Sequence, residues 1–146
     1  MRRVWVFDID GTLADCSHRL HHIEKTPKDW RAFFADVSAD SPIDHVVRLC
    51  RALAADAGVA FISGRSDECR EATLDWLSDH VGIAGARLYM RRAGDFRADD
   101  VIKVELLADM QGDGYSPIMV FDDRDRVVAA WRSVGIPCAQ VAPGDF

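Results

Sequence analysis

The sequence predicts an α/β protein, a Rossmann-like three-layer sandwich with a mainly parallel sheet and a small helical insertion after the first strand. Three observations predict this class. Short apolar, β-rich runs alternate with longer segments of helical character along the 146 residues. Acidic residues open the later helical segments, where they favour the positive end of the helix dipole. No internal repeat or low-complexity linker interrupts this alternation, which is typical of a parallel sheet with helices on both faces.

Strands are expected at the short apolar runs, namely Val4–Phe7, Val59–Ile62, Arg87–Tyr89, Ile118–Phe121 and Cys138–Val141. Helices are expected at Pro27–Val37, Pro42–Asp56, Asp67–His80, Asp99–Met110 and Asp125–Val134. Proline is favourable in the first turn of a helix, which supports the starts at Pro27 and Pro42. Gly58, Gly82 and Gly135 follow predicted helices and are expected to end them.

The segment 14–41 is too long for a simple connection between a strand and a helix. We interpret it as a small helical cap insertion that leans over the carboxyl end of the first strand, within a single domain spanning residues 1–146. It can act as a lid that shapes a substrate site, or as a surface helix that packs its aromatic residues into the core. For Trp30, Phe33 and Phe34 the packing role is favoured.

The bulk composition argues against several classes of protein. A formal net charge of −6 and a pI near 5.2 disfavour a long basic groove for duplex DNA, although a few local arginines can still contact one phosphate or one strand end. The four widely spaced cysteines form no Cys-x-x-Cys pair, so reduced thiols in a cytoplasmic protein are expected rather than zinc or disulfides. The first residues do not resemble a secretory signal, and no apolar run is long enough to cross a membrane.

The most informative stretch follows the first predicted strand, where the chain reads Asp8-Ile9-Asp10-Gly11-Thr12. Neighbouring strand side chains point to opposite faces, so Asp8 and Asp10 can point the same way. Paired acids just beyond a parallel strand lie where open α/β sheets bind ligands. This arrangement suggests a metal-bound carboxylate nucleophile with a second carboxylate as general acid and base.

Three further polar groups follow later elements of the predicted sheet. Ser63-Gly64-Arg65 follows the second strand, Asp122-Asp123 follows the fourth, and Lys103 lies in the first turns of the helix after Asp99. In a parallel sheet all of these converge on one edge. Carboxylates that hold Mg²⁺, together with a hydroxyl and a lysine that grip phosphoryl oxygens, are the groups that phosphoryl transfer requires.

In their order and spacing, these groups resemble the four motifs of the haloacid dehalogenase superfamily of phosphohydrolases. The resemblance implies that Asp8 is the nucleophile and Asp10 the general acid and base. It also implies that Asp8, the Asp10 carbonyl and Asp122 hold Mg²⁺, with Asp123 helping directly or through water. Ser63 and Lys103 would stabilise a phosphoaspartate intermediate, while Thr12 and Gly64, within the motifs, would contact substrate.

A closer resemblance is to the 3′-phosphatase domain of phage polynucleotide kinase–phosphatases. It is carried by three stretches: Tyr89–Lys103, Phe121–Val128, and Trp131–Pro137 together with the ending Gln140–Phe146. The resemblance implies removal of the 3′-phosphate from polynucleotide ends. It also implies that Arg19, Arg65 and Arg91 contact phosphate or line the entrance, and that Asp99 orients Lys103 from one helical turn away.

Two departures from the phage pattern bear on substrate and partners. No Gly-x-x-x-x-Gly-Lys-Ser/Thr phosphate loop occurs in the sequence, so in an end-healing system the kinase would be another chain, or there is none. A separate kinase or ligase partner chain is therefore left open. The insertion at 14–41 is longer than in the phage domain and lies where substrate would bind. The alternative is therefore a small-molecule phosphatase acting on a nucleotide or sugar phosphate. A phosphotransferase and a non-catalytic interaction module of an end-repair assembly are further alternatives, and the oligomeric state is left open.

Overall fold

The computed structural model describes all residues from Met1 to Phe146. Its centre is a five-stranded sheet in the order β5-β4-β1-β6-β7, and all four neighbouring pairs are parallel. The strands are β1 (Arg2–Phe7), β4 (Val59–Ser66), β5 (Leu88–Arg91), β6 (Tyr115–Asp122) and β7 (Cys138–Gln140). The predicted α/β class, with a mainly parallel sheet, is confirmed.

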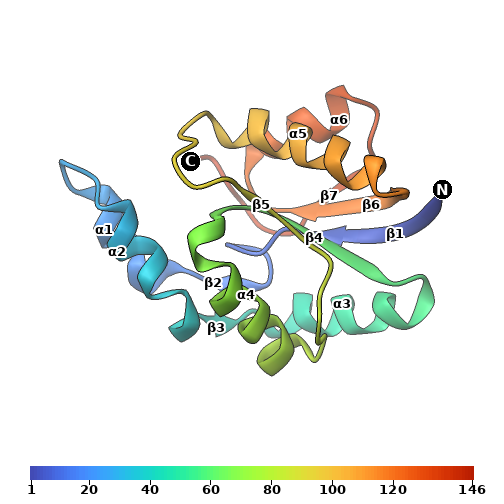
Figure 1. Cartoon of the computed structure of the whole chain (residues 1–146), viewed down its shortest axis with the longest axis horizontal. Coiled ribbons are helices and arrows are strands. Elements are labelled where there is room, and N and C mark those ends of the chain that lie inside the picture. The colour runs from blue at the N-terminus through green and yellow to red at the C-terminus, as the bar shows by residue number, and fades with distance from the viewer.

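Four longer helices cover the two faces of this sheet, giving three layers (Figure 1). They are α3 (Asp44–Asp56), α4 (Arg70–Trp76), α5 (Asp99–Gly112) and α6 (Asp125–Ser133). The pleat of β1 divides the core between the faces: Phe7 packs in the cluster with α3 and α4, and Val4 and Val6 pack in the cluster with α5 and α6. Because β1 is apolar on both faces, it occupies the middle of the sheet.

The insertion after β1 is a chain of short elements that projects from one end of the sheet (Figure 1). It comprises β2 (Ala14–Asp15), a 3₁₀ turn at Ser17–Arg19, α1 (His21–Glu24), α2 (Trp30–Ala35), a 3₁₀ turn at Val37–Ala39, and β3 (Ser41–Pro42). The antiparallel pairing of β2 with β3 closes the base of the insertion, because Ala14 lies opposite Pro42 and Asp15 opposite Ser41.

The structure corrects several predicted boundaries. The helix expected at Pro27–Val37 is only α2, capped by the Asp29 side chain, and Pro27 precedes it in a cis peptide. The helix expected at Pro42–Asp56 begins at Asp44, because Pro42 belongs to β3. The helix expected at Asp67–His80 is divided into a 3₁₀ turn at Asp67–Cys69, α4, and a π-helical turn at Leu77–Val81.

The aromatic residues of the insertion pack mostly against one another. Trp30, Phe33 and Phe34 form a cluster with ring centroids 5.3 to 6.0 Å apart. Phe33 is buried, Phe34 is half-buried against the core, and Trp30 is 38% exposed. The expectation that all three are core residues was wrong for Trp30, because the insertion carries its own small apolar centre.

All four cysteines are free, and Cys50, Cys69 and Cys138 are buried. Among the helices, none combines the length and the apolar character that a membrane crossing needs.

Candidate active site

The carboxyl ends of β1 and β6 and one face of α5 bring three charged side chains together. Lys103 Nζ donates to Asp8 Oδ1 at 2.8 Å and to Asp122 Oδ2 at 2.8 Å. All three side chains are buried. Residues separated by 95 positions in the sequence therefore meet at the edge where the sequence predicted them.

A second acid beside this group completes a cluster of carboxylates. Oxygens of Asp8, Asp122 and Asp123 lie within 4.8 Å of one another, and all three residues are buried. Carboxylate oxygens are the ligands that Mg²⁺ prefers, and one lysine does not balance three buried acids. The cluster therefore fits a divalent cation. The Asp10 carboxylate is not part of it, so Asp10 could join such a site only through its carbonyl, as predicted.

The electrostatics of the cluster reflect this excess of negative charge. Burial and the neighbouring Asp122 raise the pKa of the Asp8 carboxyl well above its usual value, although Lys103 acts in the opposite direction. Burial also raises the pKa of Asp123. Burial alone would lower the pKa of the Lys103 ammonium, but the carboxylates of Asp122 and Asp8 outweigh it and raise that pKa. Lys103 is therefore held in its charged form.

The turn after Asp10 packs directly against the acid cluster. Thr12 Oγ1 lies 3.0 Å from Asp8 Oδ2 and 3.3 Å from Asp123 Oδ1, so its hydroxyl can donate to either carboxylate. Gly11 has a φ of +79°, and a Cβ there would lie 2.1 Å from Asp123 Oδ2. Glycine at this position therefore lets the turn approach the acids closely.

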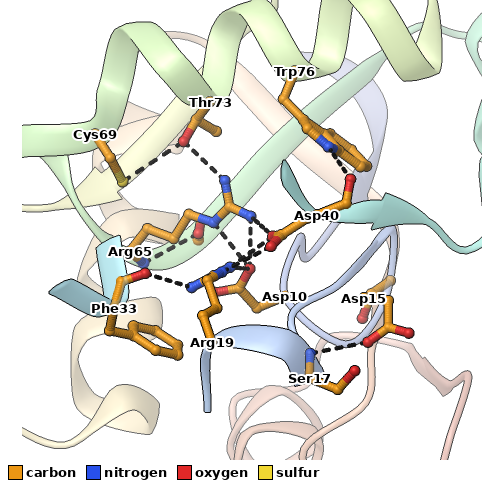
Figure 2. A network of polar contacts seen from close by, with 12 residues as sticks. Asp10, Asp15, Ser17, Arg19, Phe33, Asp40, Arg65, Cys69, Thr73 and Trp76 are labelled. Atoms are coloured by element: carbon orange, nitrogen blue, oxygen red, sulfur yellow. Dashed lines mark hydrogen bonds and ion pairs between the residues drawn. The ribbon is translucent and has the colours of Figure 1, made fainter. Parts of the chain in front are cut away.

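Asp10 is held by two buried arginines, as Figure 2 shows. Arg19 Nη2 donates to Asp10 Oδ1 at 2.7 Å, and Arg65 donates to the same oxygen through Nε at 3.0 Å and Nη2 at 2.7 Å. Asp10 Oδ2 makes none of these bonds, and the Asp10 side chain is 26% exposed. Oδ1 is thus fixed in place, while Oδ2 stays free to exchange a proton with a bound molecule.

The resemblance implies that Arg19 and Arg65 contact phosphate or line the entrance. The structure buries both side chains, so neither lines an open entrance. Arg19 and Arg65 are only 0% and 1% exposed, and each guanidinium faces Asp10 and Asp40. Arg65 reaches this position because of a bulge in β4. Ser63 pairs with Met90 and Ser66 with the next residue of β5, which leaves Gly64 and Arg65 unpaired.

Asp40 is the residue of this network that the sequence did not reveal. Its carboxylate accepts from Arg19 Nε at 2.8 Å and Nη2 at 2.8 Å, and from Arg65 Nη2 at 2.9 Å. It also lies 2.7 Å from His18 Nε2, and its backbone carbonyl accepts from Trp76 Nε1 (Figure 2). An acid just before a predicted helix is typical of a cap, so no sequence signal distinguished it.

The same arginines set the charge state of Asp10. Burial would raise the pKa of this carboxyl, but the charges and hydrogen bonds of Arg65 and Arg19 lower it below the usual value. We expect the substitution Arg65→Gln to raise the pKa of Asp10, because a positive charge and two charge-assisted hydrogen bonds disappear. Titration of carbon-labelled aspartate carboxyls by NMR measures this change. Arg126→Gln, at an exposed position of α6 that pairs with Asp100 and not with Asp10, is the control, and an unmoved Asp10 titration in Arg65→Gln would contradict the assignment.

Arg91, which the resemblance implies contacts phosphate or lines the entrance, holds the loop between β5 and α5 in the structure. Its Nε donates to the Gly64 carbonyl at 2.8 Å, and Nη1 donates to the carbonyls of Asp95 at 3.0 Å and Arg97 at 2.7 Å. Nη2 lies 3.2 Å from Asp99 Oδ1. With four of its five N–H groups engaged in this way, Arg91 ties the loop to the bulge of β4 at Gly64.

The remaining predicted residues lie in the same region. Ser63 belongs to β4 rather than following it, and its Oγ accepts from the Arg65 amide at 3.1 Å. Asp99 Oδ2 lies 4.0 Å from Lys103 Nζ, a longer contact than those of Asp8 and Asp122. A Cβ at Gly64 would lie 1.9 Å from Asp99 Oδ1, so glycine there permits close packing of the loop.

A separate cavity lies at the amino-terminal ends of the strands. It has a volume of about 660 Å³ and is lined in part by Arg2, Val59, Leu88 and Tyr115. No catalytic grouping of side chains lies in it, so the chemistry points to the acid cluster at the carboxyl ends of the strands rather than to this cavity.

Comparison with known proteins agrees with this geometry. The model of the polynucleotide kinase PNKP phosphatase domain matches residues 2–146. A protein of Autographa californica nuclear polyhedrosis virus, described as a bifunctional polynucleotide kinase/RNA ligase, is 31% identical over 137 residues. The alignment covers 92% of this chain and 18% of that protein.

Solved structures show the same fold. Two chains, from structures titled as the Pnkp1/Rnl/Hen1 complex and the Pnkp1/Rnl/Hen1 RNA repair complex, superpose with TM-scores of 0.82 and 0.83. Each is 28% identical in sequence to this chain. The superposition covers 100% of this chain, and 48% and 44% of the two matched chains respectively. The haloacid dehalogenase-like hydrolase SP0104 of Streptococcus pneumoniae shares the fold alone, at 11% identity and a TM-score of 0.66 over 96% of this chain and 84% of that one.

The chain thus spans less than half the length of the kinase/ligase relative and of the Pnkp1 complex chains that it matches. The family match extends over the whole sheet, the insertion and the acid cluster. This chain belongs to the haloacid dehalogenase-type family of PNKP phosphatase domains.

Proposed function

We propose that this chain is a Mg²⁺-dependent phosphomonoesterase that removes the 3′-phosphate from polynucleotide ends through a phosphoaspartate intermediate. The observation that carries the proposal is the position of Lys103 between Asp8 and Asp122, at 2.8 Å from each. Such a lysine can attract a phosphoryl group to the Asp8 carboxylate and balance the charge that develops there.

The proposed reaction has two steps. A carboxylate oxygen of Asp8 attacks phosphorus, the bond from phosphorus to the ester oxygen breaks, and Asp10 Oδ2 gives its proton to the leaving oxygen. In the second step Asp10 Oδ2 takes a proton from water, whose oxygen attacks the phosphorus of the aspartyl phosphate and releases inorganic phosphate with Asp8 restored. Arg19 and Arg65 favour the deprotonated form of Asp10, which suits the second step.

The other residues are proposed to support these two steps. Ser63 and Thr12 bind phosphoryl oxygens or orient Asp8, while Gly64 and the pair formed by Arg91 and Asp99 keep the loop beside them. Asp8 and Asp122, the Asp10 carbonyl, and Asp123 directly or through water would hold Mg²⁺. When bound, this ion would neutralise charge between the carboxylates and the phosphoryl group.

The polynucleotide substrate is proposed from the family and from the names of the relatives, which include a polynucleotide kinase/RNA ligase and an RNA repair complex. A separate kinase or ligase chain is a proposed partner on the same basis. Residues 1–146 are proposed to act as one phosphatase domain, with the segment 14–41 as its cap, in a cytoplasmic protein.

The decisive experiment measures phosphate release from a 3′-phosphorylated oligonucleotide in the presence of Mg²⁺. It is compared with a 5′-phosphorylated oligonucleotide, a nucleoside 3′-monophosphate and a panel of sugar phosphates. We expect the 3′-phosphorylated strand to give the highest kcat/KM, and chelation of divalent cations to abolish release. A preference for the mononucleotide or a sugar phosphate would replace the polynucleotide assignment with a small-molecule phosphatase. Activity that persists after full chelation would contradict the Mg²⁺ proposal.

A further inference from the structure

We propose that the tip of the insertion binds the body of a single-stranded nucleic acid whose 3′ end lies at Asp8. The tip is defined by Lys25, Lys28, Trp30 and Arg31, in and around the turn between α1 and α2. This inference rests on the proposed function, because it locates the part of that substrate which lies beyond the reacting phosphate. It concerns binding only and assigns no residue to the chemical step.

The charge of the tip differs from that of the molecule as a whole. Of the three lysines in this chain of formal charge −6, one is Lys103 and the other two are Lys25 and Lys28. Lys25, Lys28 and Arg31 are all exposed, and none of them forms an ion pair. Exposed positive charges without partners stabilise the fold little, but they can neutralise backbone phosphates and release counterions.

The nearby acids offset only part of this charge. Asp29 is engaged as the cap of α2, where its side chain accepts from the Ala32 amide at 3.0 Å. Asp36, at the other end of α2, lies 3.4 Å from His22 Nε2. Only Glu24 is exposed on the tip without such a contact. Residues 24–31 hold three basic side chains against the two acids Glu24 and Asp29, so the tip keeps a formal charge of +1.

Trp30 gives the tip an aromatic surface that is held in place. Its ring stacks on Phe34 at 6.0 Å with an interplanar angle of 24°, and it meets Phe33 edge-on at 5.7 Å. Lys28 Nζ lies 5.6 Å from the ring centroid. The side chain nevertheless stays 38% exposed. A fixed, partly open indole beside ammonium groups is the combination on which single-stranded nucleic acids stack their bases.

Three successive contacts, beginning with that of Trp30 and Phe33, connect this indole with the catalytic edge. Phe33, which Trp30 touches, stacks against the guanidinium of Arg19 at 4.3 Å. Arg19 in turn donates to Asp10 Oδ1 at 2.7 Å. Figure 1 shows α1 and α2 projecting beyond the sheet at the end where β1 and β6 terminate. A strand whose 3′ end reaches Asp8 can therefore extend along the insertion towards its tip.

The test measures binding of 3′-phosphorylated oligonucleotides of increasing length to the inactive Asp8→Asn protein at several salt concentrations. The variant combines Lys25→Gln, Lys28→Gln and Arg31→Gln. A matched control combines Arg2→Gln, Arg3→Gln and Arg87→Gln. These substitutions remove the same charge from exposed positions near the amino-terminal ends of the strands, away from the acid cluster. Each variant loses three positive charges. A difference in affinity between the two proteins therefore shows that the position of the lost charges matters, and not only their number.

We expect the tip variant to bind a 12-nucleotide strand about tenfold more weakly than the control. Its slope of log Kd against log salt should fall by about 2, or about 0.7 for each backbone phosphate that the variant no longer neutralises. Trp30→Ala should weaken binding about fivefold or more, with recovery in Trp30→Phe. In the active background, hydrolysis of p-nitrophenyl phosphate should be unchanged by these substitutions. Equal binding by the tip variant and the control would overturn the inference.

This design separates the inference from the proposed function. If wild-type protein releases phosphate from the oligonucleotide but the tip variant binds and reacts like the control, the function stands and the tip inference is wrong. If the Asp8→Asn protein does not bind the oligonucleotide at all while the wild type hydrolyses p-nitrophenyl phosphate, the polynucleotide substrate is wrong and the tip inference is wrong with it.

Discussion

Asp8→Asn is expected to reduce phosphate release by about 10³-fold or more and to leave the fold intact, because an amide cannot form the aspartyl phosphate. Asp8 is buried against Lys103 and two further acids, and the asparagine has nearly the same size. Loss of one negative charge also relieves repulsion within the acid cluster, so the Tm should stay within a few degrees. Steady-state phosphate release measures the activity, and thermal unfolding followed by circular dichroism measures the fold.

The control for this substitution is Asp75→Asn, which makes the same chemical change at an exposed position of α4. It should retain full activity. Mass spectrometry of acid-quenched enzyme should find a phosphorylated peptide containing Asp8 in the wild type and none in the variant. Appreciable activity in a clean preparation of Asp8→Asn would remove Asp8 from its role as nucleophile.

Asp40→Ala is expected to lower the free energy of unfolding by about 3–5 kcal/mol, because it removes one partner from a fully buried ion-pair network. The side chains of Asp40, Arg19 and Arg65 are all 0% exposed. Without Asp40, the Asp10 carboxylate is the one negative charge left to pair with the two buried guanidinium groups. Urea unfolding measures the loss, and Asp40→Asn should fall between the wild type and the alanine variant, since the amide keeps one acceptor.

The control is Asp36→Ala on the same insertion, where the carboxylate is exposed and its one contact is the 3.4 Å pair with His22. Its effect should be below about 1 kcal/mol. Activity of Asp40→Ala should also fall at temperatures where it remains folded, because Arg19 and Arg65 are no longer held against Asp10. A loss of stability no larger than that of Asp36→Ala would show that the network contributes little.

The chemistry-bearing residues could be predicted from the sequence because their positions follow from local pattern and topology. Asp8 and Asp122 come at the ends of apolar strands, and the carboxyl ends of parallel strands share one edge. Lys103 lies one turn into the helix that begins at Asp99. The positions of these side chains follow from strand and helix periodicity. They can therefore be predicted without knowing which distant segments contact one another.

The insertion could be located from the sequence but not described. Helices α1 and α2 have four and six residues, and helices of such length form only through packing. Their positions depend on the contact of Phe33 with Arg19 and on the pairing of β2 with β3. The sequence pattern therefore predicted one helix with a start at Pro27, whereas tertiary contacts divide the segment.

By itself, the sequence determined the parallel α/β sheet and the edge of it where Asp8, Lys103 and Asp122 meet. Only the tertiary structure decided what the arginines do. A bulge in β4 turns Arg65 inward, and the return of the chain at β3 brings Asp40 between Arg65 and Arg19. Buried charges must find partners, and those partners come from segments far apart in the sequence. Periodicity predicts which face a residue occupies, but the pairing of buried charges depends on which segments the fold brings together.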